Sequence, residues 1–321
     1  MTARIPKIVV VGPSYIDTAI KCAQFPLPSQ TAEGAAFSCS PTGEGPNRAV
    51  EAALCGCDVY LISKVGDDTF GQLAKDSLVS QGVNTDFVYT AQAMHTGAVV
   101  TIVNSLGENM SCISPGANRA LGTDELACAA AEQLISSADL CLIHADLPYE
   151  VVATAIKLSS IYKTKIILET KLPLNDLTGA GNIDLPKEFY SVNILVPDMG
   201  DRYAAADIGA GNVHKLKRIG SELVARGMES VVMKMGMRGS FISDGEGTAH
   251  IPGFEVEMLD HTGCSDAFAG ALAAACGSGD RLEKAVRFAS AASALACGKF
   301  AAQDSLPSKE QILTFLLEDP D

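Results

Sequence analysis

Short runs of apolar residues alternate along this chain with longer segments in which apolar residues recur every three to four positions. The runs that predict strands are Lys7–Val11, Val59–Lys64, Leu140–His144, Lys165–Leu168, Val192–Val196, Ser230–Met235 and Ser240–Ser243. The segments that predict helices are 46–55, 70–81, 123–136, 148–161, 213–226, 265–276, 281–297 and 308–317. Strands that alternate with helices form βαβ units, so we expect a mostly parallel sheet covered by helices on both faces.

Two segments break this alternation. Residues 14–42 lack helical periodicity and contain several prolines, and residues 97–113 read as two extended runs around a Leu-Gly-Glu-Asn turn. We expect these two excursions to form a small antiparallel flap on the α/β body. A length of 321 residues would allow two domains, but α/β folds of this size often form one.

The charge and the cysteine content narrow the class of protein. A net charge of −14 makes nonspecific nucleic-acid binding unfavourable, because phosphate neutralisation needs clustered Lys and Arg. It does not oppose an anionic substrate, since one helix N-terminus can bind phosphate in an acidic protein. The 10 cysteines are scattered without a CxxC pair, so we expect free thiols in a reducing compartment rather than a metal site. No segment has the length of a signal peptide or a membrane span, which predicts a soluble, cytoplasmic protein without membrane contact.

The strongest motif is Leu259–Ala275, where a loop of small residues opens directly into an alanine-rich helix. The first backbone N–H groups of a helix have no helical partner and can hold an anion. Asp266 falls in the first turn, where an acid is favoured by the helix dipole. From the residues alone, capping of the helix and catalysis are both open for Asp266.

A second loop of glycine and proline, Thr42–Asn47, also leads into a helix. Its glycines permit close approach of the backbone to a ligand, although an ordinary loop and cap would read in the same way. It lacks the third glycine of a dinucleotide fingerprint, and no GxxxxGK[ST] phosphate loop occurs in the chain. A Rossmann dehydrogenase and a Walker-type NTPase are therefore disfavoured.

The order and spacing of these motifs resemble the ribokinase-like carbohydrate kinase family (PfkB family) over roughly residues 7–317. Family members carry a first strand followed by a glycine and an acid, a GG-x-x-x-N loop, a VG-x-D-x-x-G segment and a late D-T-x-G-A-G-D-x-F signature. The corresponding residues here are Gly12 to Asp17, Thr42–Asn47, Val65–Gly71 and Asp260–Phe268, with Ser114–Asn118 resembling a further P-G-A-N stretch.

The resemblance implies a single domain over 1–321, with a three-layer α/β/α sandwich, a mostly parallel central sheet and a small β lid from about 14–42 and 96–114. It implies an ATP-dependent kinase that transfers the γ-phosphoryl group to a hydroxyl of a pentose or related sugar. Asp266 would be the base, and the backbone of Gly263, Cys264, Ser265 and Asp266 would form the anion hole. Such roles suit phosphoryl transfer, which needs alignment and charge stabilisation.

The resemblance also assigns roles to residues outside this signature. Substrate binding is expected at Asp17, Gly43 and Asn47, together with Glu44 and Tyr15, and nucleotide binding at Lys234, Gly236, Gly239 and Asp198. Asp201 would lie near Mg²⁺ and its waters, and Asp260 and Thr262 near a monovalent cation such as K⁺. A homodimer formed through the lid is expected, because a small sheet with exposed edges favours pairing.

This chain departs from the family pattern at several of these positions. Gly263-Cys264-Ser265-Asp266 replaces G-A-G-D, and Asp198-x-x-Asp201 replaces N-x-x-E. Glu44 stands where ribokinase-type members have lysine, and Tyr15 where they have asparagine. Reversal of a charge in a sugar pocket changes which substituents can be bound. The alternatives are therefore a nucleoside kinase on the same scaffold and a non-catalytic paralogue that binds a sugar or nucleotide.

Overall fold

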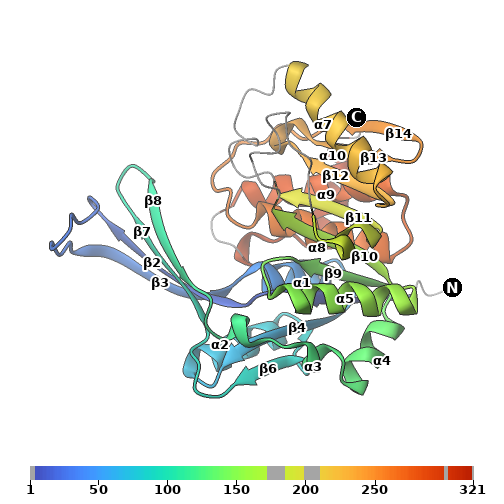
Figure 1. Ribbon diagram of the computed structural model, residues 1–321. Coiled ribbons are helices and arrows are strands. Elements are labelled where there is room, and N and C mark those ends of the chain that lie inside the picture. The colour runs from blue at the N-terminus through green and yellow to red at the C-terminus, as the bar shows by residue number, and fades with distance from the viewer. Residues whose placement is uncertain (1–3, 172–184, 199–209, 300–302, 320–321) are drawn as a thin grey trace.

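The structure is a computed structural model that describes residues 4–171, 185–198, 210–299 and 303–319. Its main sheet has 10 strands in the order β14-β13-β12-β11-β10-β9-β1-β4-β5, and β6 pairs with β4 (Figure 1). The strands are β1 Lys7–Val11, β4 Asp58–Gly66, β5 Val83–Asn84, β6 Val88–Ala91, β9 Leu140–His144, β10 Lys165–Lys171, β11 Ile194–Asp198, β12 Ser230–Lys234, β13 Ser240–Asp244 and β14 Gly247–Ile251. The pairings from β12 through β11, β10, β9 and β1 to β4 are all parallel, whereas β12–β13 and β13–β14 are antiparallel.

Helices cover both faces of this sheet. They are α1 Glu44–Leu54, α2 Thr69–Ser80, α3 Thr123–Leu126, α4 Ala129–Ser137, α5 Tyr149–Tyr162, α7 Ala210–Ala225, α8 Cys264–Gly277, α9 Leu282–Cys297 and α10 Lys309–Glu318. One apolar core joins the sheet to α1, α2, α8, α9 and α10, and a second joins it to α3, α4, α5 and α7. The three layers expected from the alternating pattern are therefore present. None of the described helices is long and apolar enough to cross a bilayer.

The sequence prediction is wrong in two details of the body. The helix expected over 123–136 is divided into α3 and α4, which are separated by Ala127 and Cys128. The short strands β5, β6 and β14 were not expected, since β5 has only two residues and β14 is mostly exposed. Such strands contain too few buried apolar residues to show the alternation of apolar and polar positions that predicts a strand.

A second sheet of four strands stands apart from the body (Figure 1). It consists of β2 Tyr15–Cys22, β3 Gly34–Thr42, β7 Gly97–Val103 and β8 Asn109–Ser114, in the order β3-β2-β7-β8. The two hairpins are antiparallel, but β2 and β7 pair in parallel, so the expectation of an antiparallel flap is wrong at the central pairing. Tyr15 and Gly97 are paired where both strands leave the body, and the two strands therefore run in the same direction.

Helices α1 and α8 pack against each other on one face of the main sheet, and their backbones come into contact at Gly270. A Cβ atom at Gly270 would lie 2.7 Å from the carbonyl oxygen of Arg48 and 2.6 Å from Cβ of Glu51, so only glycine allows this approach. Glu51 is fully buried at the contact and accepts a hydrogen bond of 3.4 Å from Sγ of Cys55. Burial raises the pKa of Glu51 to about 8. The side chain is therefore mostly protonated at neutral pH.

This buried carboxyl predicts a specific pH dependence of stability. Between its ordinary pKa of 4.5 and about 8, the folded protein keeps a proton that the unfolded chain releases. The free energy of unfolding should therefore fall as pH rises through this window, by at most about 1.4 kcal/mol per pH unit from this group. We expect Glu51→Gln to remove this slope, as measured by urea unfolding at pH 5.5, 7 and 8.5. Glu310→Gln, at an exposed position of α10, is the control, and equal slopes in all three proteins would contradict the assignment.

Candidate active site

Five side chains meet where the carboxyl ends of the parallel strands face the first turns of α1 and α8. Asp266, in the first turn of α8, accepts hydrogen bonds from Nδ2 of Asn47 at 2.8 Å and from Nε of Arg48 at 3.1 Å. Arg48 also forms an ion pair of 3.2 Å with Glu169, a residue of β10. Nζ of Lys234, at the end of β12, lies 2.9 Å from the other oxygen of Glu169. A continuous network of charges thus joins both helices to two strands.

Glu169 is the centre of this network and is only 1% exposed. Burial alone would raise the pKa of its carboxyl, but the positive charges of Arg48 and Lys234 outweigh burial and lower it to about 2. Glu169 is therefore ionised at neutral pH and holds the two cations in place. A buried carboxylate is tolerated only with such partners.

The side chain of Asp266 does not cap its own helix. The N-cap of α8 is Gly263, which has a left-handed φ of 82° and makes no side-chain cap. The carboxylate instead bonds to Asn47 and Arg48 of α1. The interpretation of Asp266 as a cap of its own helix is therefore wrong. Burial raises the pKa of Asp266, and the charge of Arg48 and the hydrogen bond from Asn47 partly offset that rise. Asp266 is thus a carboxylate whose affinity for a proton is increased by its surroundings.

The first turn of α8 also carries the residues expected to form the anion hole. Cys264, Ser265 and Asp266 are the first residues of the helix after Gly263, so their N–H groups lack acceptors within the helix. Nζ of Lys234 donates to Oγ of Ser265 at 2.5 Å, which places an ammonium group beside this helix terminus. The N–H of Cys264 donates to the carbonyl oxygen of His261 at 3.3 Å. A positive charge beside the remaining N–H groups of this first turn favours a phosphate group.

The residues expected to bind substrate lie on β2, at the N-cap of α1 (Gly43) and in the first turns of α1. Oδ1 of Asp17 accepts a hydrogen bond of 3.2 Å from Thr101 of β7, and burial raises the pKa of Asp17. Gly43 adopts a φ of 117°, and a Cβ atom there would lie 2.7 Å from the carbonyl oxygen of Pro13. Burial raises the pKa of Glu44, while Arg48 opposes the rise.

A cavity of about 220 Å³ lies beside these residues. Its lining residues are Tyr15, Ile113, Pro115, Asn118, Arg119 and Asp146. Burial, with the charges of Asp146 and Glu44, raises the pKa of Tyr15 to about 12, so the three groups are close enough to interact. The cavity wall therefore has a neutral phenol and one carboxylate, that of Asp146, and the carboxylate of Glu44 is close enough to act on the phenol.

The residues expected to bind nucleotide and metal are only partly described. Gly236 begins a short 3-10 turn after β12, and Gly239 ends it with a φ of 89°. A Cβ at Gly239 would lie 2.0 Å from the carbonyl oxygen of Ile251, so glycine is needed there for packing. Asp198 is the last residue of β11, whereas Asp201 lies outside the described residues.

The expected cation-binding residues form a local turn. Oδ1 of Asp260 accepts a hydrogen bond of 2.9 Å from the N–H of Thr262. The part of the chain that the structure describes holds no group of three or more His, Cys, Asp or Glu residues arranged for a metal ion.

Three residues of the site, Glu169, Arg48 and Gln303, were not predicted from the sequence. Glu169 had a signal, because it is a lone acid directly after the buried run Ile166–Leu168 and would need a cationic partner. Arg48 follows Asn47 and could have been that partner. Gln303 donates to Oδ1 of Asn47 at 3.1 Å across a separation of 256 residues. No local pattern in the sequence predicts that contact.

The prediction of free thiols is wrong for one pair of cysteines. Cys264, at the start of α8, forms a disulfide with Cys297, at the end of α9, with Cα atoms 5.5 Å apart. The N–H of Leu259 also donates to the carbonyl oxygen of Cys297 at 2.9 Å. The start of α8 is therefore joined to α9 by a covalent bond, and the loop before it by a hydrogen bond. The other eight cysteines are free.

Comparison with known proteins agrees with this geometry. Residues 5–309 match the family described as pfkB family carbohydrate kinase. The chain is 30% identical to a ribokinase of Bacillus subtilis over 95% of this chain and 97% of that protein. It is 26% identical to a deoxyribokinase of Salmonella typhi over 96% of this chain and 98% of that protein. The structure of Arabidopsis thaliana ribokinase complexed with ribose and ATP superposes with a TM-score of 0.83, at 23% identity, over 98% and 99% of the two chains.

The solved structure shares the ribokinase-like α/β fold. The family match and the ribokinase relative identify the chain as a phosphotransferase that acts on an alcohol group, a carbohydrate kinase. The agreement extends over nearly the whole chain. This protein belongs to the pfkB family of carbohydrate kinases.

Proposed function

We propose that the protein transfers the γ-phosphoryl group of ATP to a hydroxyl of a pentose or related sugar. The observation that carries this proposal is the mostly buried carboxylate of Asp266, held by Asn47 and Arg48 at the N-terminal end of α8. Asp266 accepts the proton of the attacking hydroxyl while the oxygen of that hydroxyl forms a bond to the γ-phosphorus. The bond between that phosphorus and the bridging oxygen breaks, and ADP leaves.

The surroundings of Asp266 support the roles of the other residues. The N–H groups of Gly263, Cys264, Ser265 and Asp266 form the anion hole, and Lys234 adds a positive charge beside it. These groups act where negative charge develops during transfer. Gly236 and Gly239 then lie beside the nucleotide in the turn that follows Lys234.

The metal ions belong to the proposal as well. Asp198 ends β11 next to the end of β10, at the edge of the sheet where Glu169 lies. One or two carboxylates with waters and phosphate oxygens suffice for Mg²⁺, and Asp198, with Asp201 through water, is the proposed pair for such an ion. The ion would neutralise charge on the phosphates. Asp260 and Thr262 are the proposed monovalent-cation residues, for K⁺, and a cytoplasmic location remains a prediction.

Substrate hydroxyls are proposed to bind Asp17, Gly43 and Asn47, with Glu44 and Tyr15 at the pocket wall. Deoxyribokinase and ribokinase are both relatives of this chain, so the family alone does not determine the sugar. A nucleoside kinase is the enzyme alternative, since the cavity beside Tyr15 could hold a group attached to the sugar. Arg119 and Asp146 line that cavity and would contact such a group.

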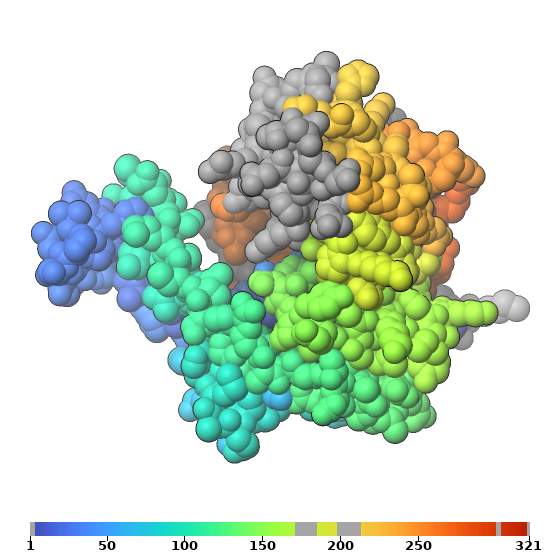
Figure 2. Space-filling model, in the orientation of Figure 1, coloured from blue at the N-terminus to red at the C-terminus, as the bar shows by residue number. Residues whose placement is uncertain are grey.

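The small sheet is proposed to act as a lid and to pair with a second copy. It projects from the body (Figures 1 and 2). Its registers place Ile20, Phe37, Ile102 and Met110 side by side on one face, opposite the face of Asp17. Phe37 and Met110 are 68% and 58% exposed. An exposed apolar face of this kind favours association, and packing against a second lid would cover it.

Asp266→Asn tests the proposed base. The amide keeps the size of the side chain but cannot accept a proton, so we expect kcat to fall by about 10²- to 10⁴-fold, as measured by ADP release with Mg²⁺ and a panel of pentoses, hexoses and nucleosides. Unfolding in urea should show an intact fold, and Asp124→Asn, at an exposed position, should retain full activity. Unchanged turnover would refute the role of Asp266. Binding of a sugar without turnover in the unaltered protein would favour the non-catalytic alternative.

Glu44→Lys tests the specificity argument. Glu44 interacts with Asp146 and Asp266 at the pocket wall, so reversal of its charge changes which substituents are tolerated. We expect the ratio of kcat/KM between the preferred sugar and its competitors to change by at least about tenfold, which corresponds to about 1.4 kcal/mol. Glu33→Lys, an exposed control on the small sheet's connecting loop, should leave the ratio unchanged. The same profile in both variants would remove Glu44 from the pocket.

Phe37→Glu tests the dimer. A charge at this exposed apolar position would have to be buried between two lids, so the variant should elute as a monomer in size exclusion with light scattering, where the unaltered protein elutes as a dimer. Val79→Glu places the same charge at an exposed position of α2, away from the lid, and should leave the dimer intact. A dimer that persists in Phe37→Glu would place the contact elsewhere.

A further inference from the structure

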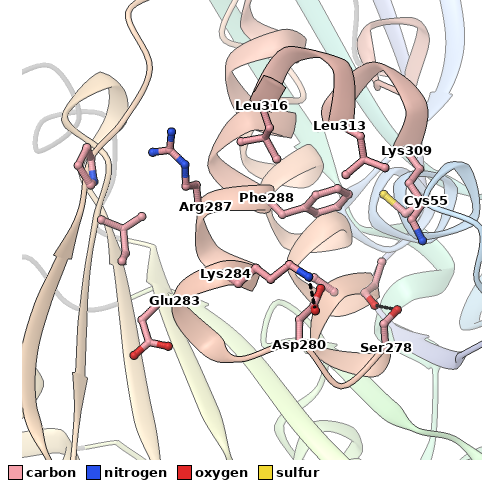
Figure 3. A pocket seen from close by; sticks show the side chains of 14 residues that line it. Cys55, Ser278, Asp280, Glu283, Lys284, Arg287, Phe288, Lys309, Leu313 and Leu316 are labelled. Carbon is pink, nitrogen blue, oxygen red and sulfur yellow. Dashed lines mark hydrogen bonds and ion pairs between the residues drawn. The ribbon is translucent and has the colours of Figure 1, made fainter. Parts of the chain in front are cut away.

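A second cavity, larger than the one beside Tyr15, lies at the opposite end of α8 from Asp266. It has a volume of about 580 Å³ and is bounded by the end of α8, the start of α9, α10, the end of β14 and the residue after α1 (Figure 3). Ser278, the C-cap of α8 in the cavity wall, lies twelve positions after Asp266, which corresponds to about 18 Å along the helix. The cavity is therefore distinct from the site of phosphoryl transfer.

The wall of this cavity is mainly apolar. Phe288 of α9 and Leu313 and Leu316 of α10 face it together with Ala274 and Ala275 of α8 (Figure 3). Leu313 is 47% exposed, so part of this apolar surface is open to solvent. Volumes of this size and walls of this composition are typical of sites for small molecules.

The charges around the cavity are not balanced. Nζ of Lys284 pairs with Asp280 at 2.7 Å, and Glu283 lies 4.0 Å from Nε of Arg281. Lys309 and Arg287 have no carboxylate within ion-pair distance among the described residues.

The two cations without a carboxylate lie at different parts of the wall. Arg287 donates to the backbone carbonyl of Asp319 at 2.9 Å and lies 5.0 Å from the ring centre of Phe254. Figure 3 shows Arg287 on one side of Phe288, and Lys309 and Cys55 on the other. Two such cations beside an apolar wall are notable in a chain of net charge −14.

We propose that this cavity is a binding site for a small amphipathic anion, with an alkyl or aryl body and one carboxylate, sulfate or phosphate group. The body would lie against Phe288, Leu313 and Leu316, where burial of apolar surface favours binding. The anionic group would meet Lys309 at the start of α10, since the guanidinium of Arg287 is already held by the carbonyl of Asp319 and the ring of Phe254. A neutral ligand of the same shape would use the wall but neither cation. This site does not depend on the proposed reaction.

Octanoate is a suitable probe, with octan-1-ol as its neutral counterpart. We expect titration calorimetry of the full chain to show one octanoate per chain, bound at least about tenfold more tightly than octan-1-ol. Lys309→Gln should weaken octanoate binding about threefold or more and leave octan-1-ol binding unchanged. Lys157→Gln, an exposed lysine of α5 on the other face of the sheet, is the matched control and should bind octanoate as the unaltered protein does.

A second variant tests the wall. Leu313→Gln should weaken both ligands, and because this side chain is partly exposed the fold should survive, as thermal unfolding would show. The proposal is overturned if octanoate does not bind, if octan-1-ol binds equally well, or if Lys309→Gln and Lys157→Gln bind octanoate alike. Self-association that octanoate does not reverse, and that Leu313→Gln abolishes, would instead assign the surface to a second copy of the chain and also overturn the proposal.

Discussion

The arrangement of the active site depends on one buried carboxylate, that of Glu169. It lies at the end of a central strand, almost without solvent, and contacts cations from two other elements. Removal of either cation would leave this buried carboxylate with one partner in place of two, which is less favourable than the intact network. The ends of β10 and β12 and the start of α1 are therefore held in one relative position. Because Arg48 extends from Glu169 to Asp266, the start of α8 is held with them.

This arrangement gives Asp266 two opposing influences. Burial increases its affinity for a proton, while Arg48 and Asn47 stabilise the ionised form. Glu169 moderates the effect of Arg48, since it shares the guanidinium with Asp266. A general base needs enough affinity to take the proton and must still be ionised when the substrate arrives. The buried ion pairs around Asp266 thus adjust its basicity as well as its position.

The sequence was sufficient for the parts of the fold that repeat a local pattern. β1 and β9 have the predicted bounds, and the helices begin and end within a few residues of the predicted ones, because each buries a regular apolar face. Asn47 and Asp266 were found through loop motifs and do meet. Contacts between residues far apart in the chain could not be predicted from local patterns, because they depend on tertiary packing. They are the disulfide of Cys264 with Cys297, the parallel register of β2 with β7, and the hydrogen bond of Gln303 to Asn47. Glu169 lies between these cases, since its burial was predictable but its partners were not.

One departure from the family signature, Ser265, is in direct contact with Lys234. Ser265 stands where the signature has its last glycine, and its hydroxyl accepts a hydrogen bond from Nζ of Lys234. The same nitrogen pairs with Glu169, so the ammonium group is held between the strand end and the helix terminus. A glycine at 265 would leave the ammonium group without the second of these partners. The side chain at 265 therefore fixes the orientation of a positive charge beside the proposed anion hole, whose N–H groups every residue type except proline can provide. This physical coupling makes the change at 265 compatible with phosphate binding.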